Sequence, residues 1–386
     1  MEIANRLRGQ DSAIFSEMDR LRVVEEDKGR DIINLSIGSP DLPPPPHVVE
    51  ALSSAVNDYN NYGYALTQGM KELRQAVADM YLKRFNVKLD PATEILSLMG
   101  SQDGLAHIYL AFINPGDWGL IPDPGYPIYS FGLFLAGGRK YPMPLVKDND
   151  FLPDLSAIPE EIADKAKIMV LNYPNNPNAA VADKAFFEEI VKFARKHHII
   201  VCHDVAYSEL AYDGFSPDSF LSVPGAKEVG VEFYSVSKTY NMAGCRLGFV
   251  VGNSKVINAL EKIKSNIDYG VFKPIQQAGI AALTGSQEWV RDLASTYAKR
   301  RDVLVDGLVE LGWQVDKPKA SMFVWLPVPK PFQHSIEFAM DLLKRAGVVV
   351  VPGIAFGDMG DKYVRLALVC SKERLQEVVD RISAHY

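Results

Sequence analysis

One lysine, Lys238, stands in a polar stretch that ends in an arginine eight residues later, Arg246. Ser235 and Ser237 precede the lysine in this segment, residues 234–249 with the sequence YSVSKTYNMAGCRLGF. A neighbouring guanidinium and partial burial both disfavour the ammonium form of an amine. A neutral amine can attack a carbonyl carbon, so the stretch predicts a Schiff-base lysine. Taken alone, the two residues also fit a surface lysine and arginine in a polar loop.

Two apolar runs end in polar residues that could complete such a site. IIVCHD ends in Asp204, and IMVLN leads into the loop YPNNPNAA, which contains Asn176. Open parallel sheets bind ligands at the carboxyl ends of their strands. A buried carboxylate there is costly unless a positive charge, such as a protonated ring nitrogen, pairs with it. Asp204 considered by itself fits a structural acid equally well.

A third segment, EILSLMGSQDG, indicates a strand, a glycine turn and a helix. The turn at Gly100, Ser101 and Gln102 would present free backbone N–H groups to an anion at the helix N-terminus. Near the end of the chain, Arg365 lies in the apolar strand YVRLALV, where a guanidinium needs a carboxylate partner. An internal acid could supply that carboxylate.

Composition narrows the class of protein. The 386 residues are 47% hydrophobic and 23% charged, which suits a globular chain of two domains. A net charge of −7 argues against a nucleic-acid partner. No apolar run approaches the roughly 18 residues of a membrane span, and the first residues have no secretory pattern. Three cysteines without metal-ligand spacing favour a reducing compartment, so we expect a cytoplasmic protein without a bound metal.

The elements that must position these residues alternate between strand and helix over residues 45–280. This alternation predicts an α/β fold whose mostly parallel sheet is covered by helices on both faces. The last part of the chain has short strands and a closing amphipathic helix, which predicts a smaller α+β domain. We expect an N-terminal arm at 1–40 that packs with the small domain, a large domain at 41–285, and the small domain at 286–386.

The pattern S-x-S-K-T followed by N-M-A-G-x-R-x-G resembles the cofactor-lysine signature of the class I and II aminotransferases, which have pyridoxal 5′-phosphate (PLP) fold type I. Six motifs occur in the order of that family, and the resemblance covers nearly the whole chain. It implies PLP as the cofactor and Lys238 as its Schiff-base lysine. It also implies that Arg246 and Ser235 hold the phosphate, with Ser237 beside them. Cys245 stands where many relatives have Trp or Gly.

The remaining cofactor contacts follow from the same resemblance. It implies a second wall of the phosphate site at Gly100, Ser101 and Gln102, an aromatic ring stacked on the cofactor at Tyr126, a partner of the ring nitrogen at Asp204, and partners of the phenolic oxygen at Asn176 and Tyr207. Among all these residues, Lys238, Asp204 and Tyr126 form the expected catalytic group. The family's Thr-Gly after the Asn-Pro pair is replaced here by Asn178 and Ala179.

The resemblance also implies which residues contact the substrate and which residue reaches a second subunit. It implies that Gly38 lies beside the substrate α-carboxylate, that Arg365 clamps this carboxylate, and that Asn176 lies near both. A tyrosine five residues before Gly69 reaches the phosphate of the partner's cofactor in the family, which here is Tyr64. We therefore expect a homodimer with shared active sites.

The expected reaction is ping-pong transfer of an amino group between an L-amino acid and a 2-oxo acid. Finer resemblance favours the LL-diaminopimelate aminotransferases, with 2-oxoglutarate as the second substrate. An alanine, methionine or aspartate aminotransferase of broader specificity is the alternative, as is a PLP-dependent C–S lyase. The segment with Asn266, Asp268, Tyr269 and Phe272 is polar and aromatic, and its acid and rings would suit a distal ammonium. It would also suit a small or apolar side chain.

Overall fold

The computed structural model describes residues 2, 4, 6 and 13–386. Its helices are α1 (Ala13–Asp27), α2 (Pro46–Val56), α3 (Lys71–Phe85), α4 (Ser101–Phe112), α5 (Pro127–Leu135), α6 (Glu160–Ala163), α7 (Lys184–His197), α8 (Ala226–Val229), α9 (Val236–Thr239), α10 (Ser254–Lys264), α11 (Lys273–Thr284), α12 (Glu288–Glu310), α13 (Ser335–Ala346) and α14 (Lys372–Ser383). Its strands are β1 (Ile33–Asn34), β2 (Ile95–Leu98), β3 (Trp118–Asp123), β4 (Arg139–Pro144), β5 (Ala166–Asn172), β6 (Ile200–Asp204), β7 (Gly230–Ser235), β8 (Gly248–Gly252), β9 (Phe323–Pro327), β10 (Val348–Val349), β11 (Val351–Pro352) and β12 (Tyr363–Ala367).

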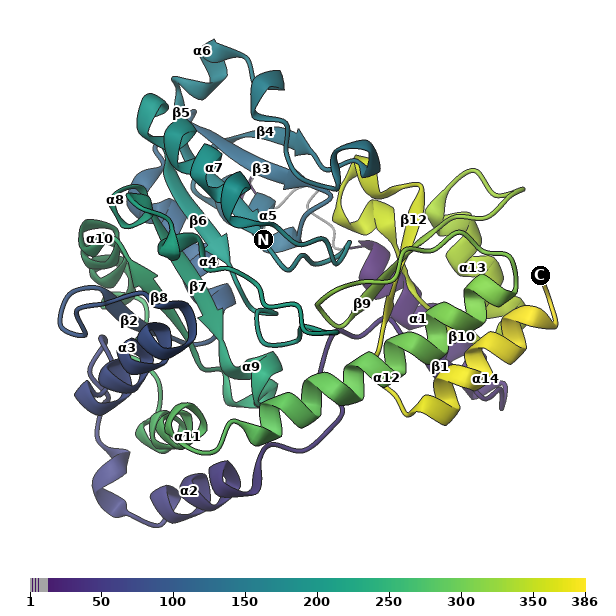
Figure 1. The fold of residues 1–386 in the computed structure, drawn as a ribbon, viewed down its shortest axis with the longest axis horizontal. Coiled ribbons are helices and arrows are strands. Elements are labelled where there is room, and N and C mark those ends of the chain that lie inside the picture. The colour runs from purple at the N-terminus through teal and green to yellow at the C-terminus, as the bar shows by residue number, and fades with distance from the viewer. Residues whose placement is uncertain (1, 3, 5, 7–12) are drawn as a thin grey trace.

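A seven-stranded sheet in the order β2-β8-β7-β6-β5-β3-β4 forms the centre of the larger part of the molecule (Figure 1). Strand β8 runs antiparallel to both of its neighbours, β2 and β7. The other neighbouring strands are parallel. The predicted α/β fold with a mostly parallel sheet is therefore confirmed.

Side chains along each strand point alternately to the two faces of this sheet. Helices pack on both faces. In β5, Ile168 and Val170 pack into a core with α4, α5 and α10, whereas Met169 and Leu171 pack into a core with α3, α7 and α11. All four side chains are buried. A sheet buried on both faces needs continuous apolar strands, and IMVL in β5 is such a run.

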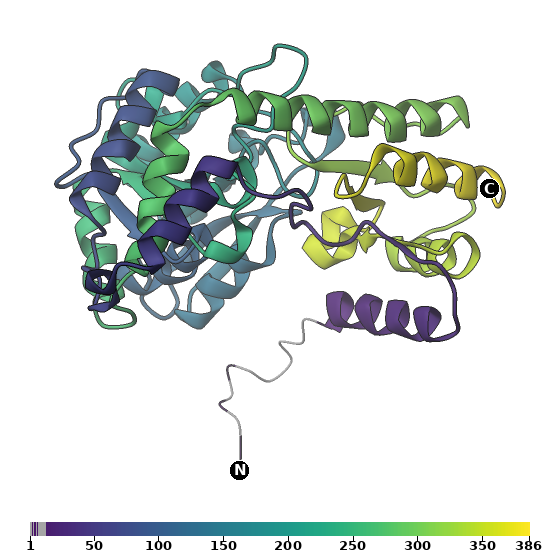
Figure 2. The same ribbon diagram turned by 90° about the horizontal axis from the view of Figure 1, so that it is seen from below.

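The smaller part contains the antiparallel sheet β11-β12-β9 and the helices α13 and α14. Helix α12 leads into it from the larger part, and Figure 2 shows its length across both. Along α12, Val290 belongs to the core of the larger part, and Leu293 and Tyr297 belong to the core of the smaller part. The domain boundaries at 40 and 285 stay predictions. No helix in residues 13–386 is long and apolar enough to cross a membrane.

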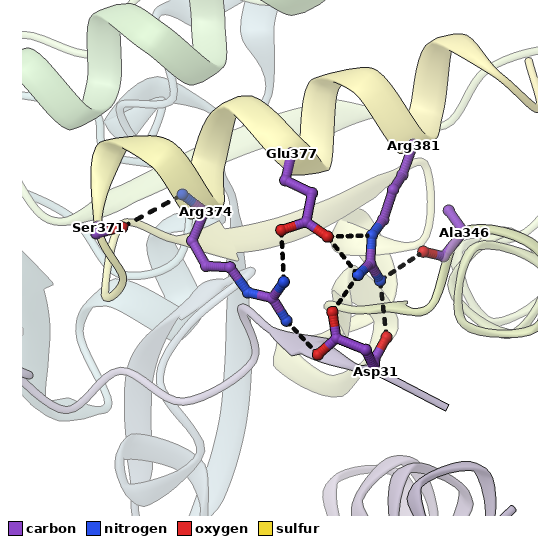
Figure 3. Close-up of polar contacts among 6 residues, drawn as sticks. All are labelled: Asp31, Ala346, Ser371, Arg374, Glu377 and Arg381. Atoms are coloured by element: carbon purple, nitrogen blue, oxygen red, sulfur yellow. Dashed lines mark hydrogen bonds and ion pairs between the residues drawn. The ribbon is translucent and has the colours of Figure 1, made fainter. Parts of the chain in front are cut away.

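The segment before residue 40 packs on the smaller part through β1, which pairs in parallel with β10. Just before this strand, Asp31 lies between two arginines of α14 (Figure 3). Its carboxylate oxygens accept hydrogen bonds from Arg374, at 2.5 Å, and from Arg381. Both arginines also bind Glu377. A network of this kind holds a segment more firmly than one exposed pair does, and it fixes the course of the chain towards Gly38.

Candidate active site

A cavity of about 450 Å³ lies where the parallel strands end and the smaller part meets the larger one. The residues predicted from the sequence that line it are Gly38, Ser101, Gln102, Tyr126, Asn176, Asp204, Tyr207, Ser235, Ser237, Lys238, Arg246 and Arg365. They come from segments more than 300 residues apart in the chain, between Gly38 and Arg365. Gly100 does not line the cavity itself but lies against the guanidinium of Arg246. Tyr64 is exposed and lies outside the cavity.

Lys238 lies in the single-turn helix α9, which begins directly after β7. Ser235 caps this helix, because its hydroxyl accepts a hydrogen bond of 3.2 Å from the backbone N–H of Ser237. The Lys238 amine donates to the carbonyl oxygen of Gly38. Burial, together with the guanidinium groups of Arg365 and Arg246, lowers the pKa of Lys238 to about 8, although the charge of Asp204 acts in the opposite direction. A large share of the amine is thus neutral near pH 8, as a nucleophile requires.

Asp204 ends β6 and is buried. Its Oδ2 accepts a 2.8 Å hydrogen bond from the hydroxyl of Tyr129, and its Oδ1 accepts one of 3.2 Å from the backbone N–H of Ala206. Burial raises the pKa of Asp204, and these two hydrogen bonds oppose the rise. No ion pair with Asp204 is found among the described residues. A buried carboxylate without a cation in contact suits a ligand that brings a positive charge.

Asn172, at the end of β5, connects Asp204 with Asn176. The two strand ends are in register, with Asn172 opposite Asp204. The Asn172 amide donates a 2.8 Å hydrogen bond to the carbonyl oxygen of Asp204, and its side-chain oxygen accepts one of 2.7 Å from the backbone N–H of Asn176. Asn172 is fully buried. One side chain therefore sets the relative position of two predicted cofactor contacts.

Arg365 is buried without an acid. Its two terminal nitrogens donate to Asn176 Oδ1 at 2.8 Å and to the carbonyl oxygen of Ser36 at 2.7 Å. Its guanidinium carbon lies 4.2 Å from the ring centre of Phe323 and 4.9 Å from that of Phe356. Burial lowers the pKa of Arg365 to about 10. Within the described chain no internal carboxylate pairs with it, so a bound carboxylate would find an uncompensated cation.

The predicted anion site forms where α4 begins. Gly100 precedes the helix with a φ of 82°, and a Cβ at this position would lie 2.4 Å from a terminal nitrogen of Arg246. The guanidinium thus lies against the glycine turn, and only glycine permits this approach. Gln102, in the first turn, accepts a 3.1 Å hydrogen bond from the hydroxyl of Tyr126. One region of the cavity is lined by the N-terminus of α4, by Arg246 and by the hydroxyls of Ser235 and Ser237. Such a set of donors suits an anion.

Tyr64 does not contribute to the cavity of its own chain, and 86% of its surface is exposed. Its ring packs on Tyr269 at a centroid distance of 4.9 Å. A second exposed pair, Tyr62 and Phe272, lies 5.5 Å apart. The two loops that carry these aromatic rings therefore form one exposed surface.

The comparisons with known proteins agree with this geometry. Residues 30–382 match the family described as aminotransferase class I and II. The chain is a class I and II aminotransferase. It is 50% identical to the LL-diaminopimelate aminotransferase of Moorella thermoacetica, over 99% of this chain and 98% of that protein.

Solved structures agree with the sequence comparison. Substrate-bound BacF from Bacillus subtilis is 41% identical and superposes with a TM-score of 0.95, covering 100% of this chain and 98% of that one. A probable N-succinyldiaminopimelate aminotransferase from Thermus thermophilus is 40% identical, with a TM-score of 0.91 over 96% of this chain and 99% of that one. The expected family, its fold type I and the aminotransferase class of enzyme are thereby confirmed.

Several residues of this aminotransferase escaped the sequence analysis. Tyr129 and Asn172 read as core residues of a helix and a strand, and no motif marks them as partners of Asp204. Phe15 and Asp19 line the cavity from α1, which the sequence analysis left without a role. The hydroxyl of Tyr129 reaches Asp204 only because α5 packs beside the end of β6. The sequence of neither segment alone therefore predicts this contact.

One interpretation needs correction. The sequence suggests Asp268 as a partner for a distal substrate ammonium, but its carboxylate binds the Lys264 amine, with both oxygens at 2.7 Å. Lys264 is fully buried and also binds Asp103 at 3.1 Å. The charge of Asp268 is therefore balanced inside the chain. A buried lysine requires such partners, because an unpaired charge in the interior is costly.

Proposed function

We propose that this aminotransferase uses PLP and that the cavity around Lys238 holds it. The observation that carries the proposal is the buried Asp204, which lines the same cavity as Lys238 and contacts no cation within the described part of the chain. A protonated pyridine nitrogen would pair with this carboxylate. Gly100 and Arg246 fit the phosphate, because the glycine turn leaves room for the guanidinium beside the N-terminus of α4. Tyr126 would lie along the ring, and Asn176 and Tyr207 would bind its phenolic oxygen.

When bound, PLP supplies the electron sink that makes the substrate Cα–H acidic. The chain's own residues do the rest. Asp204 holds a proton on the ring nitrogen, and Tyr129 and Asn172 keep Asp204 in place. Arg365 binds the α-carboxylate near Gly38 and orients the substrate. Lys238, whose pKa is lowered, would take the proton from the substrate Cα and deliver it to the cofactor carbon.

For the substrate we propose LL-diaminopimelate with 2-oxoglutarate as amino acceptor. Support comes from relatives named LL-diaminopimelate aminotransferase, which are 45–50% identical over almost the whole chain. A broader alanine, methionine or aspartate aminotransferase is the second candidate, because an aspartate aminotransferase of Thermus thermophilus superposes with a TM-score of 0.93. We further propose that the enzyme acts in the cytoplasm.

A half-reaction panel tests the function. The PLP-loaded enzyme is mixed with LL-diaminopimelate, alanine, methionine, aspartate or glutamate, without a 2-oxo acid. We expect conversion to the pyridoxamine-type spectrum after one half-turnover, fastest with LL-diaminopimelate. Reaction with alanine or methionine but not with LL-diaminopimelate would favour the second candidate. Steady release of ammonia and pyruvate would instead indicate a C–S lyase.

We propose a homodimer in which Tyr64 contacts the phosphate of the partner's cofactor. The exposed aromatic surface of Tyr62, Tyr64, Tyr269 and Phe272 supports this, since large exposed apolar groups usually mark an interface. Equilibrium sedimentation tests it: the chain has a mass of 42.8 kDa, and we expect about twice that value at micromolar concentration. Full activity at the monomer mass would contradict the proposal.

A further inference from the structure

One charged side chain of the cavity has no part in the proposed function. Asp204, Lys238, Arg246 and Arg365 each have a role, but Asp19 lines the same cavity from α1. Besides Asp204, it is the one acid among the described residues of the cavity wall. A substrate with a distal ammonium would therefore meet one unassigned carboxylate of this chain, and that carboxylate belongs to Asp19.

Helix α1 is held against the smaller part, so Asp19 is not on a free segment. The ring of Phe15 contacts that of Phe356 edge-on, with the centroids 5.7 Å apart. Phe15 packs on the buried cluster of Trp325, Val351 and Phe356. Phe356 in turn lies against the guanidinium of Arg365. The helix that carries Asp19 is thus connected by packed rings to the residue that would hold the α-carboxylate.

The carboxylate of Asp19 is oriented but not fully occupied. Its Oδ1 accepts hydrogen bonds from Arg22, at 2.9 Å from Nε and 2.7 Å from the terminal nitrogen. Glu26 takes another terminal nitrogen of Arg22 at 2.6 Å. No hydrogen bond to Asp19 Oδ2 is found in the part of the chain that the structure describes. One oxygen is therefore held and the other is open to a donor.

The other candidate acid, Asp268, is already paired with a buried cation of its own chain. Asp268 gives both oxygens to the buried Lys264 amine, and its Oδ1 also accepts from the backbone N–H of Gly270 at 2.7 Å. If Asp268 bound a second cation, its buried ion pair with Lys264 would be disrupted, at a large cost in free energy. Asp19 is also paired, with Arg22, but 61% of its side chain is exposed, so a second cation can approach it without disrupting a buried pair.

We propose that Asp19 determines specificity by binding an ammonium group at the far end of the substrate side chain. This inference rests on the proposed function, since Arg365 must hold the α-carboxylate for the side chain to point towards α1. It predicts a preference for amino acids with a distal cation.

Matched substrates test the proposal. L-lysine and L-norleucine have side chains of similar length and differ in the distal ammonium. In the native enzyme we expect a higher kcat/KM for lysine, and in Asp19→Asn we expect the lysine-to-norleucine ratio to fall about fivefold, as loss of a solvent-exposed ion pair would give. The norleucine value should stay constant. An unchanged ratio would overturn the proposal.

Two variants serve as controls. Glu17→Gln removes a charge from the same helix, but Glu17 pairs with Arg20 and does not line the cavity, so the ratio should not move. Asp19→Glu keeps the charge and should retain most of the preference. A fall in the ratio for Glu17→Gln equal to that for Asp19→Asn would mean that general surface charge, not Asp19, sets the preference.

A binding measurement separates this inference from the proposed function. 6-Aminohexanoate and hexanoate match lysine and norleucine without the α-amine, so neither has an α-amino group to transfer. By calorimetry we expect 6-aminohexanoate to bind more tightly, and Asp19→Asn to reduce this advantage about fivefold. If no amino acid gives the pyridoxamine-type spectrum, the proposed function fails. If norleucine reacts but Asp19→Asn moves neither ratio, only the role of Asp19 fails.

Discussion

The hydroxyl of Tyr129 donates a 2.8 Å hydrogen bond to Asp204 Oδ2 and so joins α5 to the end of β6. Both side chains are buried. The bond opposes the effect of burial, which raises the pKa of Asp204. Since Tyr126 contacts Tyr129 edge-on at 6.0 Å, the expected ring-stacking residue and the expected ring-nitrogen partner share one support. Tyr129 is therefore a positioning residue of the site.

Tyr129→Phe should raise the pKa of Asp204 further and weaken its hold on a protonated ring nitrogen. We expect kcat to fall about tenfold with little change in KM, since a hydrogen bond to a charged group contributes about 1.5–3 kcal/mol. The pH titration of the cofactor's visible band should shift as well, which a purely structural role would not cause. Tyr109→Phe is the control, because the buried hydroxyl of Tyr109 has no hydrogen-bond partner among the residues that the structure describes.

The lowered pKa of Lys238 predicts how the cofactor-free protein captures PLP. Since only the neutral amine reacts, the capture rate should rise with pH and level off above a midpoint near 8. An ordinary lysine would give a midpoint near its usual value of 10.5. Arg365→Met removes one cause of the lowered pKa and should move the midpoint to higher pH. The rate of appearance of the visible band measures this, and a midpoint near 10 in the native protein would contradict it.

Gly100→Ala should weaken PLP binding. A methyl group there would lie 2.4 Å from Arg246, and the φ of 82° is strained for alanine. Strain of about 1–3 kcal/mol implies a rise of about 5- to 150-fold in the dissociation constant of PLP, measured by titration of the visible band. Gly116→Ala is a matched control, because Gly116 has a φ of 93° but nothing within 4 Å of the added methyl. Equal losses in both variants would show that backbone strain alone is responsible.

The buried ion cluster of Lys264 predicts a pattern of stabilities. Lys264→Met leaves the carboxylates of Asp103 and Asp268 without their cation, although their side chains are only 10% and 16% exposed. We expect the free energy of unfolding to fall by about 3–5 kcal/mol. The triple variant Asp103→Asn, Lys264→Met, Asp268→Asn should recover most of the loss, because it removes the charges as well.

Urea unfolding at fixed protein and PLP concentration measures this difference, since dimerisation and cofactor binding both alter apparent stability. The pKa of Asp103, lowered to about 2 by His107 and Lys264 against the effect of burial, gives a second check. The stability that Asp103 contributes should persist above pH 4 and be lost as the pH falls towards 2. A triple variant no more stable than Lys264→Met would contradict the explanation.

The sequence by itself determined the elements and the chemistry at their ends. Apolar runs with a polar last residue, as in IIVCHD, predict buried strands, and parallel strands must present those ends at one edge of the sheet. Asp204, Asn176 and Lys238 were therefore predictable as neighbours. Their expected cofactor chemistry came from the resemblance to the aminotransferase family, because the residue types alone also fit a surface lysine and a structural acid.

Only the tertiary structure decided which side chains complete the site. The hydrogen bond of Tyr129 spans 75 residues and that of Arg365 to Asn176 spans 189, so neither leaves a periodic trace in the sequence. Asp268 is a different case, because its cation Lys264 lies only four residues away. The pattern of the sequence does not reveal that Lys264 is fully buried at the end of α10 and needs this carboxylate. Local periodicity specifies strands and helices, but contacts between distant segments depend on how these elements pack, and packing assigned partners to Asp204 and Arg365.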